Sequence, residues 1–193
     1  EHVKRGLAFQ PVKFGISFTV SVLNQAGALV VVYTDGSAQI NHGGTEMGQG
    51  LHTKMAAIAA DTLGLPSDRI RVMHTNTEKV PNTTPTAASS GSDLNGAAVL
   101  DACRKITDRM RPIAAGILDC PEADVRFEAG QIRGGGNSKT FAEVANACWV
   151  QHVSLSATGF WATPGVAYDR EAGQGTPFYY FAYGAAVSEV ELN

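Results

Sequence analysis

Cysteine, charge and long apolar runs are all scarce in this chain, and each shortage excludes a class of protein. The cysteines Cys103, Cys120 and Cys148 are widely separated and form no Cys-x-x-Cys pair, which argues against a disulfide framework or a thiolate metal site and favours free buried thiols. No apolar run approaches the ~20 residues that span a bilayer. Charged residues make up 17% of the sequence and the formal net charge is −3, so we expect neither nucleic acid nor a membrane as a partner.

Familiar catalytic motifs are missing as well. The chain has no P-loop, no G-x-S-x-G elbow and no histidines at a metal-ligand spacing. Its glycine-rich segment does not match the G-x-G-x-x-G dinucleotide fingerprint, and we expect no parallel β-α-β unit around it. Glu46 lies in that segment and could act as a general acid or base, but a glutamate in a loop is usually solvated and has no catalytic role. Residues 1–5 lack the apolar stretch of a secretory signal, and together with the free thiols this favours a cytoplasmic protein.

The pattern of apolar residues predicts the secondary structure. The chain has 193 residues, 44% of them hydrophobic, which suffices for one sizeable core or two small subdomains. Alternation predicts strands over 14–23, 28–34, 37–41, 69–74, 153–161 and 178–192. Helical spacing predicts helices over 51–63, from Ser92 or Asp93 to about 118, and over 141–150, with Pro112 bending or interrupting the second. With a small hairpin over 125–133, this predicts an α+β fold of antiparallel sheets and packed helices, and any subdomain junction should lie near 118–140.

Two loops of small residues lead into helices and carry the chemistry of the chain. The first, His42–Gly50, holds four glycines, and the second is Ala87–Ser92. Glycine lets a backbone approach a ligand closely, and the free N–H groups at a helix start favour an anion such as phosphate. Serine hydroxyls and the Gln49 amide add donors and an acceptor for ligand atoms. On residue type alone, the two loops fit either of two interpretations, a site for a polar cofactor or a pair of ordinary capped turns.

Several short motifs occur together in a set order. They are F-G-I-S-F-T at 14–19, D-G-S at 35–37, H-G-G-T-E-M-G-Q-G at 42–50, V-P-N-T at 80–83, T-A-A-S at 86–89, S-L-S-A-T-G-F at 154–160, F-A-Y-G at 181–184 and S-E-V at 188–190. This ordered set resembles the molybdenum-cofactor-binding part of xanthine dehydrogenases, in the xanthine oxidase family and in its bacterial large-subunit form. The resemblance covers nearly the whole chain. It implies that 1–193 is a central segment of a larger molybdopterin-binding domain, as the charged opening and the uncapped last strand also indicate.

The resemblance implies roles for individual residues. The glycine loop would hold the phosphate and pterin of molybdopterin through Met47, Gly48 and Gln49. Phe18 and Thr19 would contact a purine substrate, which replaces the core packing that strand alternation alone predicts for them. The second loop would line the cofactor, with the backbone N–H of Ala88 nearest the molybdenum. Its residues are Thr86, Ala87, Ala88, Ser89, Ser90, Gly91 and Ser92.

Other parts of the family's site are missing from this chain. The family's base is a glutamate in a G-E-P-P motif, and no Gly-Glu-Pro occurs here. The R-G-F-G-G segments that grip substrate and the clustered cysteines of iron–sulfur domains are absent too. We therefore expect no catalytic residue in this chain, with the base supplied downstream. The [2Fe–2S] clusters, FAD and NAD would be bound by other segments, subunits or domains of an oligomeric parent enzyme.

The complete enzyme implied by the resemblance hydroxylates hypoxanthine or xanthine. Water supplies the oxygen, and electrons leave through iron–sulfur centres to FAD and NAD. One alternative is an aldehyde oxidase of the same family, because this chain lacks the residues that separate the two specificities. Another is that the segment is a non-catalytic cofactor-binding or scaffolding piece when isolated.

Overall fold

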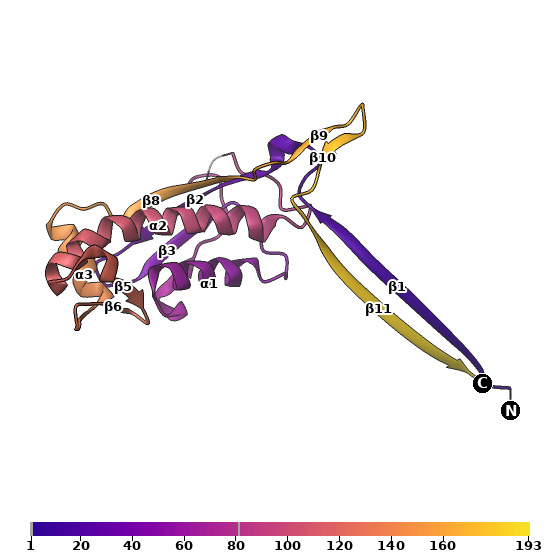
Figure 1. The fold of residues 1–193 in the computed structure, drawn as a ribbon, viewed down its shortest axis with the longest axis horizontal. Helices are drawn as coiled ribbons and strands as arrows, with labels where there is room; N and C mark the ends of the chain where they lie inside the picture. The colour runs from indigo at the N-terminus through magenta and orange to yellow at the C-terminus, as the bar shows by residue number, and fades with distance from the viewer. Residues whose placement is uncertain (1, 81) are drawn as a thin grey trace.

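A body of helices and sheets and a long two-stranded arm make up the structure (Figure 1). The computed structural model describes residues 2–80 and 82–193. Glu1 of the charged opening and Pro81 of the V-P-N-T motif lie outside the described residues. Within those ranges, the body combines three helices with a four-stranded sheet in the order β4-β3-β2-β8 and a three-stranded sheet. The predicted α+β class is confirmed, and the junction near 118–140 stays a prediction.

The first hairpin of the body forms as the sequence predicts. Strand β2 (Gln25–Val32) pairs antiparallel with β3 (Ala38–His42). Every second residue of β2 is buried, in the order Ala26, Ala28, Val30 and Val32. At the turn, Gly36 has a φ of +79°, which glycine adopts without steric cost. The Asp35 carboxylate accepts the backbone N–H and the hydroxyl of Ser37 at 2.9 and 2.6 Å.

The glycine loop lies inside a parallel β-α-β unit, so the expectation that no such unit surrounds it was wrong. Helix α1 (Leu51–Leu63) and the short turn η2 (Ser67–Arg69) return the chain to β4 (Ile70–Val72), which pairs parallel with β3. Alternation identifies a strand but not the direction in which it pairs, so the sequence pattern did not reveal the parallel pairing of β4. This crossover places the loop at the carboxyl end of β3, the end at which open α/β sheets bind ligands.

Helix α2 (Gly91–Leu118) crosses the sheet and fills the core (Figure 1). Of the apolar stripe that predicts this helix, Val99, Cys103, Ile106 and Met110 are fully buried, Ile113 is only partly buried and Ile117 is 38% exposed. Burial raises the pKa of the Cys103 thiol to about 12, so it stays protonated and inert. Pro112 does not interrupt the helix. No helix of the described residues is long and apolar enough to cross a membrane.

The outer edge of the four-stranded sheet is covered by side chains of α2. Strand β8 (Ser156–Ala162) is that edge, and its Phe160 N–H donates to the Asp101 carboxylate at 3.0 Å. One and two turns further along, Lys105 and Arg109 donate to carbonyl oxygens of β8 at 3.1 and 3.0 Å. Helix and strand approach so closely at Gly159 that a Cβ there would lie 1.9 Å from the Ala98 carbonyl oxygen. The edge is therefore closed to further strands.

The smaller elements complete the body. The three-stranded sheet confirms the predicted hairpin over 125–133 and adds a third strand that the sequence pattern missed. Helix α3 (Phe141–Val150) begins with a capping box between Thr140 and Glu143. The remaining elements are η1 (Ser21–Leu23), η3 (Glu122–Asp124), β5 (Arg126–Glu128), β6 (Gln131–Gly134), β7 (Asn137–Thr140), β9 (Ala167–Asp169) and β10 (Gln174–Thr176).

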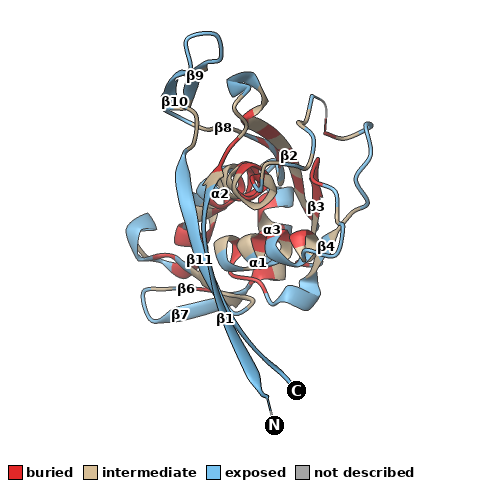
Figure 2. Cartoon of the chain, turned by 90° about the vertical axis from the view of Figure 1, so that its right-hand side faces the viewer, coloured by how far each residue is buried: buried red, intermediate tan, exposed pale blue. Residues whose placement is uncertain are grey.

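The arm joins the two ends of the chain. Strands β1 (Lys4–Ile16) and β11 (Tyr180–Leu192) pair antiparallel along their whole length and project from the body, exposed on both faces (Figure 2). Lys4 and Arg5 of the charged opening therefore begin a strand. Its pattern was not recognised because its partner lies at the far end of the sequence.

The predicted strand over 14–23 was wrong beyond Ile16. Ser17 has a φ of +138° and breaks the strand. The next residues form a bend that the Asn24 side chain holds. Asn24 Oδ1 accepts the Phe18 N–H at 2.8 Å, and Asn24 Nδ2 donates to the Phe18 carbonyl oxygen at 2.9 Å. As a result, Phe18 and Thr19 lie at the junction of arm and body.

Candidate cofactor and substrate site

The two small-residue loops meet in the structure. The Thr45 N–H of the first loop donates to the Thr86 hydroxyl of the second at 2.8 Å. A cavity of about 460 Å³ opens between the loops. All of the predicted cofactor residues except Gly48 and Ser90 line it, together with two residues that the sequence did not single out. The lining is Met47, Gln49, Leu51, Lys54, Thr86, Ala87, Ala88, Ser89, Gly91 and Ser92.

The start of α1 is occupied by a carboxylate of its own loop. Glu46 accepts the N–H groups of Gly48, Gly50 and His52 at 2.8, 3.0 and 2.9 Å. These bonds, led by the one from His52, lower the pKa of the Glu46 carboxyl. Of the N–H groups that we expected to face outward at the start of this helix, that of His52 is therefore bound by the loop's own carboxylate. Sequence reasoning missed this because a reach from position 46 to 52 depends on the loop's fold.

Gln49 also bonds within the loop. Its Oε1 accepts the Met47 N–H at 2.6 Å, and its Nε2 donates to the Thr45 carbonyl oxygen at 2.9 Å. Each of these two atoms keeps one further hydrogen-bonding capacity. Gln49 is therefore fixed by the loop first and has one donor and one acceptor left for a ligand.

Helix α2 begins differently. No side chain caps its N-terminus, so the predicted caps Ser92 and Asp93 were wrong, and the Ser90 hydroxyl donates backwards to the Ala87 carbonyl oxygen at 3.1 Å. Ala88 and Ser89 take φ values of +53° and +54°. Left-handed backbone at residues other than glycine costs roughly 1–2 kcal/mol each and occurs repeatedly at ligand-binding sites. The N-terminus that faces the cavity without a capping side chain is thus that of α2.

Lys54 brings the only cationic side chain to the lining of this cavity. It lies one turn into α1 and joins none of the ion pairs among the described residues. The sequence could have indicated Lys54, because it follows Leu51 by three residues and so lies on the same face of the helix that begins at the loop. A cation and a helix N-terminus on one cavity suit an anionic ligand.

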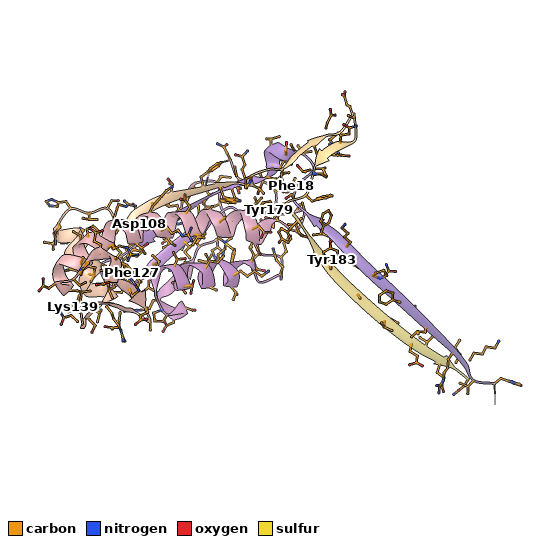
Figure 3. All side chains as sticks on the ribbon, viewed as in Figure 1. Phe18, Asp108, Phe127, Lys139, Tyr179 and Tyr183 are labelled. Carbon is orange, nitrogen blue, oxygen red and sulfur yellow. The ribbon has the colours of Figure 1, made fainter. Side chains whose placement is uncertain are left out.

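A second cavity of about 700 Å³ adjoins the first at the base of the arm. Phe18 and Thr19 line it, which contradicts core packing and agrees with a role toward a ligand; Figure 3 shows Phe18 beside Tyr179 at this junction. Phe178 and Phe181 stack edge to face there with ring centroids 5.7 Å apart. Lys13, Phe14, Gly15, Ser17 and Ala88 complete the lining. Ala88 is the residue that both cavities share.

The described residues contain no group of three or more histidine, cysteine, aspartate or glutamate side chains placed to hold a metal ion.

Comparison with known proteins identifies the family. A family model described as "Molybdopterin cofactor-binding domain" matches residues 1–193. This chain belongs to that family. Among the relatives, it is 53% identical over 190 residues to a xanthine dehydrogenase of Oryza sativa subsp. japonica and 51% identical over 193 residues to one of Dictyostelium discoideum. The predicted resemblance is confirmed, while the bacterial form stays a prediction.

The family members are much larger than this chain. The match covers 98% of this chain but only 12% of the rice protein and 13% of the Dictyostelium protein. Among solved structures, quinoline 2-oxidoreductase from Pseudomonas putida 86 has the same fold, with a TM-score of 0.79 at 21% identity, covering 98% of this chain and 25% of that one. The segment is thus part of a larger molybdenum-enzyme architecture.

Proposed function

We propose that this chain holds the molybdenum cofactor of a xanthine dehydrogenase and forms one wall of its purine site. The observation that carries the proposal is the position of Ala88. Its strained backbone lies between a cavity lined by Lys54 and the start of α2 and an aromatic cavity lined by Phe18 and Thr19. A cofactor in the first cavity and a planar substrate in the second would meet there.

The residues present suit molybdopterin. Lys54 and the N-terminus of α2 favour its phosphate, and the positive-φ residues Ala88 and Ser89 line the same cavity. Met47 and Gln49 form the facing wall, and the backbone N–H of Ala88 is the group we place nearest the molybdenum. When bound, the cofactor supplies the oxidation of a heterocycle carbon with oxygen from water.

The chain's own share is orientation of the substrate. Phe18 and the Phe178–Phe181 pair offer flat apolar surfaces to a planar ring, and the Thr19 hydroxyl offers a donor or acceptor to its edge. Glu46 is a poor base because three N–H groups hold its carboxylate. The general base is therefore expected from the downstream G-E-P-P segment of the parent enzyme.

The parent enzyme would act in purine catabolism in the cytoplasm as an oligomer. Its iron–sulfur and FAD-binding segments would pass electrons to NAD, and this chain would bind none of those groups. The aldehyde-oxidising alternative predicts a different preference. Assaying the full-length enzyme with xanthine and with an aromatic aldehyde separates the two: a higher kcat/KM for the aldehyde would reject the purine assignment.

Elemental analysis and one variant test the proposal directly. Purified full-length enzyme should contain molybdenum, and a preparation of folded enzyme without it would reject the cofactor role. Thr19→Val should raise KM for xanthine by about tenfold, as expected for the loss of one substrate hydrogen bond, while the molybdenum content stays unchanged. Thr19→Ser keeps the hydroxyl and serves as the control. A loss of molybdenum in Thr19→Val with an unchanged KM would show that the two cavities have been assigned wrongly.

A further inference from the structure

Two imidazole rings lie directly behind the glycine loop. His42 ends β3 and is 1% exposed, and His52 lies in the first turn of α1. Their ring centroids are 5.1 Å apart and their planes meet at 87°. Within the described residues, Nε2 of each ring is buried and has no hydrogen-bond partner. Because this chain itself encloses both atoms, a further segment of the parent enzyme does not reach them.

The hydrogen bond at the other nitrogen of His42 fixes its tautomer. Nδ1 accepts the Gly44 N–H at 3.1 Å. An accepting nitrogen carries no proton, so the proton of the neutral ring is on Nε2. Burial, and then repulsion from His52, lower the pKa of His42 to about 4 against the opposing effect of Glu46. At neutral pH, His42 therefore presents a buried Nε2–H donor that needs an acceptor.

We propose that one internal water joins Nε2 of His42 to Nε2 of His52 and that this bridge positions the glycine loop. The water accepts the His42 Nε2–H and donates to His52 Nε2. An internal water needs two to four polar partners. The buried Oδ1 of Asn95 also lacks a partner among the described residues, and Asn95 borders the loop at Gly44. It offers the water's second hydrogen an acceptor.

The bridge clamps the loop at both ends. His42 holds the Gly44 N–H at the beginning, and the backbone of His52 is tied to the Glu46 carboxylate at the end. A protonated His42 carries a hydrogen on Nδ1, which faces the Gly44 N–H and removes that bond. His52 and Glu46 are the titratable groups that act on His42. Since its pKa in the fold lies below the ordinary 6.5, its stabilising effect declines as the pH falls below 6.5 and is lost near pH 4.

A high-resolution crystal structure of the full-length enzyme tests the water directly. We expect a water within hydrogen-bond distance of both Nε2 atoms in the wild type. In His42→Asn the side-chain oxygen still accepts the Gly44 N–H but does not extend to the water, so the water should be absent. A wild-type structure without that water, or with either Nε2 bonded to protein, overturns the proposal.

Cofactor release tests the positioning role, which rests on the proposed function. Molybdenum released from the holoenzyme should increase about tenfold in rate from neutral pH to about pH 4 in the wild type. His42→Asn and His52→Gln should release faster at neutral pH and lose most of that acceleration. The exposed His152 provides the control His152→Asn, which should behave as the wild type. An unchanged acid acceleration in His42→Asn rejects the role of His42. A parent enzyme without molybdenum rejects the proposed function instead, and the crystal structure still decides the water.

Discussion

The starts of α1 and α2 meet at one cavity but are built in opposite ways. At α1, Glu46 accepts the N–H groups of Gly48 and Gly50 before the helix and of His52 in its first turn, so the chain's own negative charge lies at the helix start. At α2, no side chain caps the helix, and the preceding Ala88 and Ser89 hold a strained left-handed backbone. The first loop is thus complete by itself, while the second has features that a ligand would complete. Two loops of similar composition therefore differ in role. The loop before α1, here called the frame, is held by its own hydrogen bonds, and the loop before α2, the contact surface, is the one left to bind a ligand.

The largest effect is expected from a substitution that disrupts the contact surface, the loop before α2. Ala88→Val puts a β-branched side chain on a left-handed backbone at the boundary of both cavities. Strain of roughly 1–3 kcal/mol and the lost space should reduce the molybdenum content of the full-length enzyme by about a hundredfold. Ala88→Gly relieves the strain and should keep the cofactor. Normal molybdenum content in Ala88→Val would remove Ala88 from the site.

Lys54 tests whether the cavity is an anion site. Lys54→Met removes the cation that lines it and should lower the affinity for the cofactor by about tenfold, as for a charge-assisted hydrogen bond. Lys139→Met removes a partly buried lysine that pairs with Glu143 and lies far from Phe18 (Figure 3), and it should change the cofactor content by less than about twofold. Equal effects of the two variants would mean that only net charge matters.

Glu46 tests the frame. In Glu46→Gln the three N–H groups face a neutral oxygen, so the loop should loosen and release molybdenum about threefold faster. Because its carboxyl pKa is lowered, Glu46 stabilises the fold above the ordinary value of 4.5, and that stabilisation is lost as the pH falls through the lowered value. The variant should lack this acid-dependent loss in thermal unfolding. If the thermal stability of the variant fell at acid pH as much as that of the wild type, other carboxyl groups would be responsible for the loss.

The smallest expected effect, at Gly48, distinguishes backbone strain from steric contact of an added side chain. A Cβ at Gly48 would meet no atom within 4 Å, yet its φ is +98°. Gly48→Ala should therefore cost roughly 1–2 kcal/mol in the free energy of unfolding through backbone strain alone. Gly136, with a φ of +81° and open space around it, lies in a distant hairpin and provides the control Gly136→Ala. Both variants should lose stability in urea unfolding, and only Gly48→Ala should weaken cofactor retention.

Local patterns predicted the elements that depend on near neighbours. Helix α1 was predicted at its observed bounds because its apolar spacing and the following Gly64 act within a few turns. The β2–β3 hairpin followed from Asp35 and Gly36 in the same way. Two features did not follow from local periodicity. The strand over 14–23 was overextended because Asn24 bends the chain, and β1 was missed because its partner is β11.

The sequence by itself determined the family, the small-residue character of both loops and most of the residues that line the cavity, because these follow from motif order and residue type. Only the tertiary structure decided which helix start is open, that Lys54 lines the same cavity, and that Phe18 and Thr19 meet Ala88. The physical reason is that hydrogen-bond partners and cavity walls come from segments tens of residues apart, whose meeting no local pattern records.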